Sequence, residues 1–321
     1  MLHCNSTIPT GLPEYQRAEA SATSEVDHDL PDIDTAKAAC PSMATGQVFH
    51  NLRETNEKLT GPPAKKLVEQ SQVFNGPFQD VKVLDNACGG GILTRELFAL
   101  SAQHSTNTEI SRVVAGDIDE RMLTYVKQLS ADGGWQQVET LRFDQASVLL
   151  EDASFTHVLS SFGIFFSPEE GKVLSETLRL LQPGGVAGFT SWKYLGWWHD
   201  IAILALEKNF PDAPALPHPA GIFPSKGWND PEQVRSKMEG AGLKDVVVEE
   251  LSFTPETEAE GFAAACAFLV KGMAAKLWPK GVNERYGDMI QPAFVRFLRE
   301  NYDGGKWTGK MIALVSTGRK E

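Results

Sequence analysis

Short runs of apolar and β-branched residues alternate with longer amphipathic segments from residue 81 onward. Short runs bounded by turn residues are typical of strands, whereas apolar positions spaced three or four residues apart are typical of helices. The first five strands are expected at Val81–Asn86, Arg112–Gly116, Val138–Phe143, Phe155–Ser161 and Gly185–Ser191, and the helices between them at Ile92–Leu100, Glu120–Ser130 and Glu169–Leu181. This alternation predicts an α/β fold with a parallel sheet covered by helices on both faces.

The pattern changes after the Pro183-Gly184-Gly185 turn, which is expected to end the last of these helices. Residues 195–229 are rich in aromatic residues and proline, which indicates an insertion. The elements expected beyond it are a helix at Pro231–Ala241, a strand at Val246–Phe253, helices at Glu258–Trp278 and around Pro292–Asn301, and a strand at Met311–Ser316. Because a long helical excursion separates the last two strands, we expect them to form an edge hairpin in which the last strand is antiparallel.

The first 44 residues do not show this alternation of strand-like and helix-like apolar patterns. Seven acidic residues against two basic ones, with few apolar positions, are typical of a segment that cannot bury enough surface to fold. We therefore expect a disordered acidic arm at residues 1–44, followed by one domain over residues 45–321. Within that domain, residues 45–75 are expected to form a helical cover, and residues 193–230 and 256–305 are expected to be insertions.

Composition narrows the classes of partner. The net charge of -12, without a basic stripe, disfavours nucleic acid, because such binding relies on Lys and Arg to neutralise phosphates. The sequence contains neither a secretory signal pattern nor a run of about 18 to 20 apolar residues long enough to span a membrane. Its four cysteines are scattered without metal-ligand spacing. These features predict a cytoplasmic protein with reduced thiols and no structural metal.

A glycine-rich turn, Asp85-Asn86-Ala87-Cys88-Gly89-Gly90-Gly91, lies where the first strand leads into a helix. Glycine lets the backbone approach a ligand, and the free N–H groups of a helix start face that ligand. A dinucleotide site would need a third small residue, but that position is Thr94 or Ile92, depending on where the count begins. No Gly-Lys-Ser/Thr follows, so a P-loop is excluded as well.

Three carboxylates follow three consecutive strands. Asp85 lies at the turn, where its carboxylate would tolerate a sulfonium. Asp117 ends the second strand, where it could accept hydrogen bonds from both ribose hydroxyls. Asp144 ends the third strand, where it could accept a hydrogen bond from an adenine amino group. Each alone is at least as well explained as a solvated or helix-capping Asp, and Asp119 is interpreted as such a cap. Together they predict a site for S-adenosylmethionine.

With these residues, the chain resembles class I S-adenosylmethionine-dependent methyltransferases, in which D-x-[GA]-x-G-x-G ends the first strand and an acid ends the second. More narrowly, it is similar to fungal secondary-metabolite methyltransferases of the gliotoxin thiomethyltransferase type. The motifs that carry this similarity are Glu57-Lys-Leu-Thr-Gly61, Val83-Leu-Asp-Asn-Ala-Cys-Gly89, Thr156-His-Val158, Phe162-Gly163, Trp192, Trp197, Gly227-Trp228 and Gly242-Leu-Lys-Asp-Val-Val-Val248. The resemblance implies a Rossmann-like, mostly parallel seven-stranded sheet with an antiparallel edge strand and a helical cover.

The resemblance also implies roles for individual residues. Asp85, Ala87 and Gly89 would line the methionine end of S-adenosylmethionine. Asp117 and Ile118 would hold the ribose and adenine. The remaining cofactor residues would be Asp144 and Gln145 at the adenine edge and Ser161 beneath the sulfonium. The demethylated product would be S-adenosylhomocysteine.

Aromatic residues after the fourth and fifth strands are the candidates for binding the methyl acceptor. We expect this role for Phe166, Trp192, Trp197 and Trp228, although for any one of them core packing is as good an explanation. His199 lies in this cluster but is better explained as a helix-start residue, so no catalytic base is assigned. The two expected insertions would frame this acceptor site.

The sequence thus favours methyl transfer to a small molecule, with a thiol first and a hydroxyl or amine second. A thiol with a pKa of about 8.5 supplies a thiolate after modest tuning, whereas alcohols and phenols usually need a base. A cofactor-binding protein that catalyses another reaction, or a regulatory partner on the same fold, stays open as an alternative. The sequence assigns no oligomeric state.

Overall fold

The computed structural model describes residues 46–104 and 108–321. The arm predicted at residues 1–44 lies outside the described residues, and the proposed division of the chain stays a prediction. None of the helices in the described ranges has both the length and the apolar character needed to cross a membrane.

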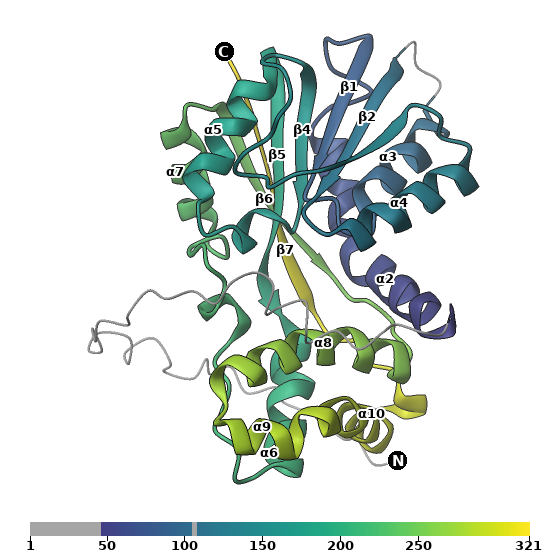
Figure 1. Cartoon of the computed structure of the whole chain (residues 1–321), viewed down its shortest axis with the longest axis vertical. Helices are drawn as coiled ribbons and strands as arrows, with labels where there is room; N and C mark the ends of the chain where they lie inside the picture. Colours follow the sequence, from purple (N-terminus) through teal and green to yellow (C-terminus); the bar gives the residue numbers. More distant parts are fainter. Residues whose placement is uncertain (1–45, 105–107) are drawn as a thin grey trace, which may run out of the picture. The chain divides into compact units, whose positions relative to one another are not determined.

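The elements alternate in the predicted order (Figure 1). The helices are α2 (Gly46–Gln70), α3 (Ile92–Ser101), α4 (Glu120–Gly133), α5 (Glu170–Leu180), α6 (Ile203–Asn209), α7 (Pro231–Ala241), α8 (Ala259–Leu277), α9 (Lys280–Tyr286) and α10 (Ile290–Asn301). The strands are β1 (Asp80–Asn86), β2 (Glu109–Asp117), β3 (Val138–Arg142), β4 (Phe155–Ser161), β5 (Leu181–Leu195), β6 (Lys244–Phe253) and β7 (Met311–Arg319). Every predicted helix and strand is present. The sequence pattern did not predict α6 and α9 as separate helices.

The seven strands form one sheet in the order β3-β2-β1-β4-β5-β7-β6. The first five strands in this order, β3, β2, β1, β4 and β5, pair in parallel with their neighbours, and β7 pairs antiparallel with both β5 and β6. The α/β fold class is therefore confirmed, including the antiparallel pair at one edge. Within that pair β7 is the inner strand and β6 the outer one.

The sheet is buried on both faces because its strands have apolar residues at successive positions. Val83 and Leu84 of β1 illustrate this: both are fully buried, and they belong to core clusters on opposite faces. One face packs against α5 and α7, whereas the other packs against α2, α3 and α4. The carboxyl ends of the parallel strands therefore meet at a common edge between two helical layers.

A second group of helices lies beyond this edge (Figure 1). β5 is longer than predicted, because Trp192–Leu195 continues to pair with Met311–Ala313 of β7. This extension leads through a helical turn at Trp198–Ala202 into α6, which packs with α8 and α10 around a core that includes Trp198 and Trp307. The helices within the two predicted insertions thus pack against each other next to the carboxyl edge of the sheet.

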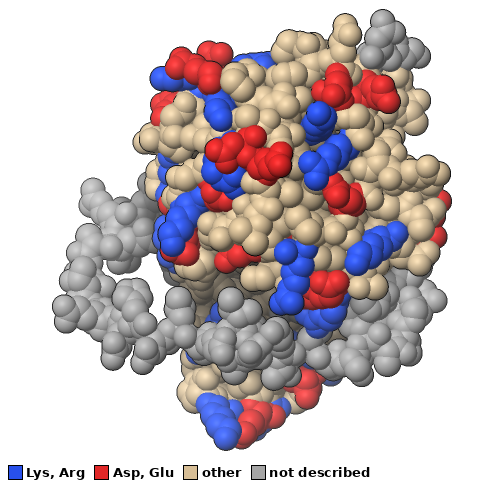
Figure 2. Space-filling model, turned by 45° about the horizontal axis from the view of Figure 1, so that its top comes forward, with Lys and Arg blue, Asp and Glu red and all other residues tan. Residues whose placement is uncertain are grey.

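Charged side chains of both signs are interspersed over the face drawn in Figure 2, where Lys and Arg lie beside Asp and Glu. Ion pairs such as Lys66–Glu249 and Lys82–Asp80 join residues on or beside the sheet. Exposed pairs of this kind contribute about 0 to 1 kcal/mol each. They keep the local charge balanced more than they stabilise the fold.

Candidate functional site

The glycine-rich turn adopts an unusual backbone at the carboxyl end of β1. Ala87, Gly89 and Gly91 all have positive φ, at 60°, 49° and 78°, and Gly91 immediately precedes α3. A Cβ at Gly89 would meet no atom within 4 Å, so the turn borders open space at this residue. Ala87 is strained where glycine would be relaxed, because positive φ brings a Cβ close to its own backbone.

Asp85 is buried beneath this turn, with only 1% of its surface exposed. Its Oδ2 accepts hydrogen bonds from the Thr94 backbone N–H at 3.1 Å and from the Thr94 hydroxyl at 2.7 Å. Its Oδ1 is buried without a partner among the described residues. Burial raises the pKa of this carboxyl to about 7. The arrangement therefore leaves a carboxylate oxygen ready for a cationic or hydrogen-bonding ligand.

Asp117 connects the ends of β1 and β2. Its Oδ2 accepts from the Gly89 N–H at 2.8 Å, and its Oδ1 accepts from the Asp119 N–H at 2.9 Å. Each carboxylate oxygen has a further lone pair, so both can still accept from ligand hydroxyls. Asp119 accepts from the Arg121 N–H at 2.9 Å and is the N-cap of α4, which confirms its interpretation as a cap.

The expected adenine residues lie beside Asp117. Ile118 leaves 45% of its surface exposed, which is unusual for an isoleucine and suits contact with a flat ring. Asp144 accepts from the Ala146 N–H at 2.9 Å and so closes a tight turn after β3. The Gln145 side chain donates to the Gly163 carbonyl at 3.1 Å, which joins the β3 turn to the end of β4.

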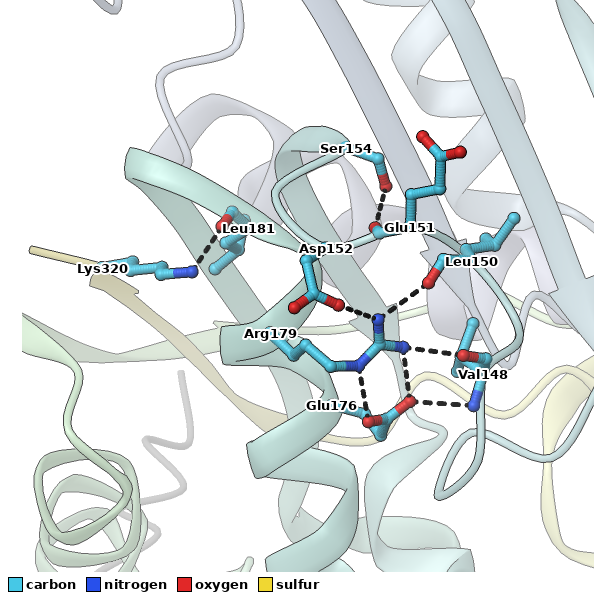
Figure 3. Close-up of polar contacts among 9 residues, drawn as sticks. All are labelled: Val148, Leu150, Glu151, Asp152, Ser154, Glu176, Arg179, Leu181 and Lys320. Atoms are coloured by element: carbon cyan, nitrogen blue, oxygen red, sulfur yellow. Dashed lines mark hydrogen bonds and ion pairs between the residues drawn. The ribbon is translucent and has the colours of Figure 1, made fainter.

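The loop carrying Asp144 and Gln145 is held in place by α5 (Figure 3). Arg179 donates to the carbonyls of Val148 and Leu150, each at 2.7 Å. Glu176, which is also bound to Arg179, accepts from the Val148 N–H at 2.9 Å. This guanidinium therefore fixes the backbone of a loop that has no regular secondary structure of its own.

The end of β4 lies very close to the glycine-rich turn. A Cβ at Gly163 would lie 2.6 Å from both the Ala87 Cβ and the Ser160 Oγ, so only glycine fits there. Ser161 contacts the Thr190 hydroxyl at 3.2 Å, and it remains half-buried at the strand end. The side chains of Asn86 and Ser160 are buried here without partners among the described residues. Unpaired polar groups at this junction indicate a place built for a ligand or water.

Two of the four expected acceptor residues lie at one small cavity beyond β4 and β5. Trp192 and Trp228 both line it, and its volume is about 10 Å³. Trp192 also stacks on Phe162, with ring centroids 4.2 Å apart. Phe166 is 56% exposed, whereas Trp197 is 5% exposed and packs in the core of the helical layer. The structure thus does not bring Phe166 or Trp197 to this cavity lining.

Two comparisons bear on what this edge does. Residues 84–189, from β1 into β5, match the family model described as a methyltransferase domain. Methyltransferase tpcH of Aspergillus fumigatus is 27% identical over 287 residues, covering 85% of this chain and 99% of that protein. The chain is an S-adenosylmethionine-dependent methyltransferase.

A second relative of the methyltransferase is the acetylaranotin bis-thiomethyltransferase of Aspergillus terreus. It is 28% identical over 270 residues, covering 83% of this chain and 92% of that protein. The expected resemblance to fungal thiomethyltransferases is therefore confirmed, and it extends well beyond residues 84–189. Among solved structures, the YcgJ protein of Bacillus subtilis aligns with a TM-score of 0.49 at 11% identity, over 81% of this chain and 98% of that one.

The residues of the methyltransferase at this edge fit the cofactor that the family implies. The unpaired Oδ1 of Asp85 suits the cationic methionine end, and the space at Gly89 admits a ligand close to the backbone. Asp117 retains lone pairs for two ribose hydroxyls, and Ile118 offers an exposed apolar surface. Within the ranges that the structure covers, no three His, Cys, Asp or Glu side chains are grouped as a metal site would require.

Several residues of the candidate site were missed by sequence reasoning. Thr94, considered only as a failed glycine position, is the hydrogen-bond partner of Asp85. Arg179 lies on a surface helix, and nothing in the sequence around it distinguishes it from an ordinary solvated arginine. His218 lines the cavity from a segment without regular structure. No periodicity marks such contacts, because they join segments far apart in the sequence.

Proposed function

We propose that this methyltransferase methylates the sulfur of a small-molecule thiol, a secondary metabolite. The observation that carries the proposal is the chemistry of the cavity lining. Its residues are Phe165, Ser191, Trp192, Leu195, His218, Ala220, Phe223, Ser225, Gly227, Trp228 and Asn229. They include no carboxylate, lysine or tyrosine, and the one titratable side chain among them, His218, is a weak base because burial lowers its pKa to about 4. Thiols are the acceptors that depend least on a general base.

The similarity to a relative named as a bis-thiomethyltransferase supports sulfur as the acceptor atom. The aromatic lining supports a largely apolar acceptor, because such surfaces bind ligands by burial and leave few polar groups to fix orientation. Trp192 is the residue best placed to contact it, since its indole is part of the lining and its ring stacks on Phe162 at the end of β4.

The proposed cofactor site rests on eight residues of the chain. They are Asp85, Ala87, Gly89, Asp117, Ile118, Asp144, Gln145 and Ser161. When bound, S-adenosylmethionine supplies a methyl group that is already activated by its sulfonium. The chain then needs mainly to align the acceptor sulfur with that methyl and to exclude water. The hydrogen-bonded turns at Asp117 and Asp144 would hold the nucleoside in place for this alignment.

A panel of acceptors tests the proposed function. Purified protein is incubated with labelled S-adenosylmethionine and matched aromatic thiols, phenols and amines, and both the methylated product and S-adenosylhomocysteine are quantified by mass spectrometry. We expect the thiols to be methylated at sulfur, with one S-adenosylhomocysteine formed per product. Faster transfer to the matched phenols or amines would overturn the assignment to sulfur.

Variants on the acceptor side sharpen this experiment. Trp192→Ala should raise KM for the thiol at least tenfold and leave the affinity for the cofactor unchanged, because it removes a large part of the aromatic lining. Leu204→Ala is the matched control, since Leu204 is an exposed apolar residue on α6 and does not line the cavity.

A further inference from the structure

His218 is the only titratable side chain in the lining of the cavity. It lies between α6 and α7 and begins a short 3-10 turn at Pro219–Gly221. The cavity, about 10 Å³, has room for about one water-sized group. It therefore suits the reacting end of an acceptor, whose remainder would lie outside it.

A backbone hydrogen bond determines which nitrogen of His218 carries the proton. Its Nδ1 accepts from the Ala220 N–H at 3.2 Å, so the lone pair of Nδ1 is already engaged. In the neutral ring the proton must then be on Nε2. Nε2 has no hydrogen-bond partner among the residues that the structure describes. The ring thus presents a donor and has no free acceptor.

Neighbouring rings keep this imidazole neutral. It stacks on His199, with centroids 5.6 Å apart, and meets Trp198 edge-on at 6.2 Å. Burial, and then the nearby His199, lower the pKa of His218 to about 4. The other lining residues carry no titratable group, so no side chain of the lining offers a charge that would restore protonation.

We propose that His218 is a neutral hydrogen-bond donor that stabilises the thiolate form of the acceptor through Nε2–H. This proposal rests on the proposed function. The thiol proton is released to solvent; the thiolate sulfur then forms a bond to the methyl carbon, and the bond from that carbon to the cofactor sulfonium breaks with its electron pair returning to the cofactor sulfur. His218 itself neither gains nor loses a proton in this sequence.

The donor also explains a preference among acceptor classes. A hydrogen bond to an anion lowers the pKa of the bound acid by about one to two units. Such a shift brings a thiol of ordinary pKa about 8.5 close to neutrality, whereas a phenol of pKa about 10 stays mostly protonated. The inferred substrate class is therefore a thiol, selected through its acidity.

An absorbance titration tests the donor role at equilibrium. An aromatic thiol, whose thiolate absorbs at longer wavelength than the thiol, is bound to the full chain together with S-adenosylhomocysteine and titrated with base. In the native protein we expect the thiol to ionise about one to two pH units below its value in free solution. His218→Leu should remove most of that shift, and His218→Gln, which keeps an N–H donor, should restore part of it.

Matched measurements make the outcome decisive. His104→Leu is the control, because His104 stacks on Phe74 and is absent from the cavity lining. Thermal unfolding and cofactor affinity identify any variant that fails to fold. If His218→Leu does not fold, the thiol ionisation of the native protein is compared with that of His218→Gln and His218→Asn. An unchanged thiol ionisation in folded His218→Leu would overturn the donor role even if thiols are methylated. Absence of thiol methylation by the native protein would instead overturn the proposed function.

Discussion

Asp85 combines full burial with an incomplete set of hydrogen bonds. One oxygen is bound twice by Thr94, while the other has no partner in the part of the chain that the structure describes. Burial disfavours the charged form, which is why the pKa of this carboxyl rises to about 7. A cationic ligand at the turn would reverse that effect, because it favours the carboxylate.

Binding of S-adenosylmethionine should therefore release a proton from Asp85. At pH 6 the carboxyl of the free protein is mostly protonated, and the approaching positive charge lowers its pKa. Calorimetric titrations in two buffers of different ionisation enthalpy should give different apparent enthalpies, corresponding to nearly one proton per site. Asp85→Asn should bind with the same enthalpy in both buffers. Identical enthalpies for the native protein would show that Asp85 does not change its charge.

The close approach of β4 to the glycine-rich turn gives a prediction at Gly163. Gly163→Ala places a methyl group 2.6 Å from the Ala87 Cβ, so the turn must shift. We expect a loss of about 1 to 3 kcal/mol in unfolding free energy, together with weaker cofactor binding. Gly171→Ala is the matched control in α5, where a Cβ meets nothing within 4 Å. That control should gain about 0.5 to 1 kcal/mol from better helix propensity.

At the scale of elements, α5 supports a loop that it does not adjoin in sequence. Arg179 and Glu176 satisfy the backbone groups of Val148 and Leu150, and Asp152 also pairs with Arg179 (Figure 3). A loop anchored in this way can present Asp144 and Gln145 without regular secondary structure. The anchor is therefore part of how the proposed nucleoside site is built.

Arg179→Met should loosen this loop. The substitution leaves two partly buried carbonyls without donors, so we expect about 1 to 3 kcal/mol of destabilisation. Amide exchange over residues 143–154 should become faster, and S-adenosylmethionine should bind more weakly. Lys172→Met is the control on the same helix, because Lys172 only pairs with Glu169 at the surface. Unchanged exchange in the loop would contradict the anchoring role.

The sheet and its helices could be read from the sequence because burial on both faces leaves an apolar pattern, as in β4, whose predicted bounds of Phe155–Ser161 match the structure. Strand ends also located Asp85 and Asp117 correctly at one edge. The acceptor side was harder to predict, because an indole in a core and an indole in a binding site look alike in sequence. Trp197 is the example, since it packs in the helical layer.

At the scale of the whole molecule, the stability of the fold should depend on His157 in β4. This residue is buried, and its Nε2 lies 3.2 Å from the carbonyl of Ser71, just beyond α2. Burial lowers the pKa of His157 to about 4. The native state thus holds it neutral, while the unfolded chain takes up a proton below about pH 6.5.

The contribution of His157 to the unfolding free energy should accordingly fall by roughly 3 kcal/mol as the pH falls from about 6.5 to about 4. Asp85 acts in the opposite sense, because its raised pKa removes stability as the pH rises from about 4 to about 7. Denaturant unfolding across this range separates the two contributions. Because Asp85 acts over the same pH range, the comparison is the difference in unfolding free energy between the native protein and His157→Gln at each pH. That difference should change by roughly 3 kcal/mol between about pH 6.5 and about pH 4, and a difference independent of pH would rule out a contribution from His157.

The proposed cofactor site lies where the glycine-rich turn meets the acid of β2. Titration calorimetry with S-adenosylmethionine on native protein, Asp117→Ala and Asp119→Ala tests this most directly. Asp117→Ala should lose charge-assisted ribose contacts worth about 1.5 to 3 kcal/mol. Its affinity for S-adenosylmethionine should therefore be roughly 10- to 150-fold lower than that of the native protein. Asp119→Ala, which removes the cap of α4 and the ion pair with Arg121, should bind the cofactor like the native protein. Equal affinities for the native protein and Asp117→Ala would contradict the proposed site.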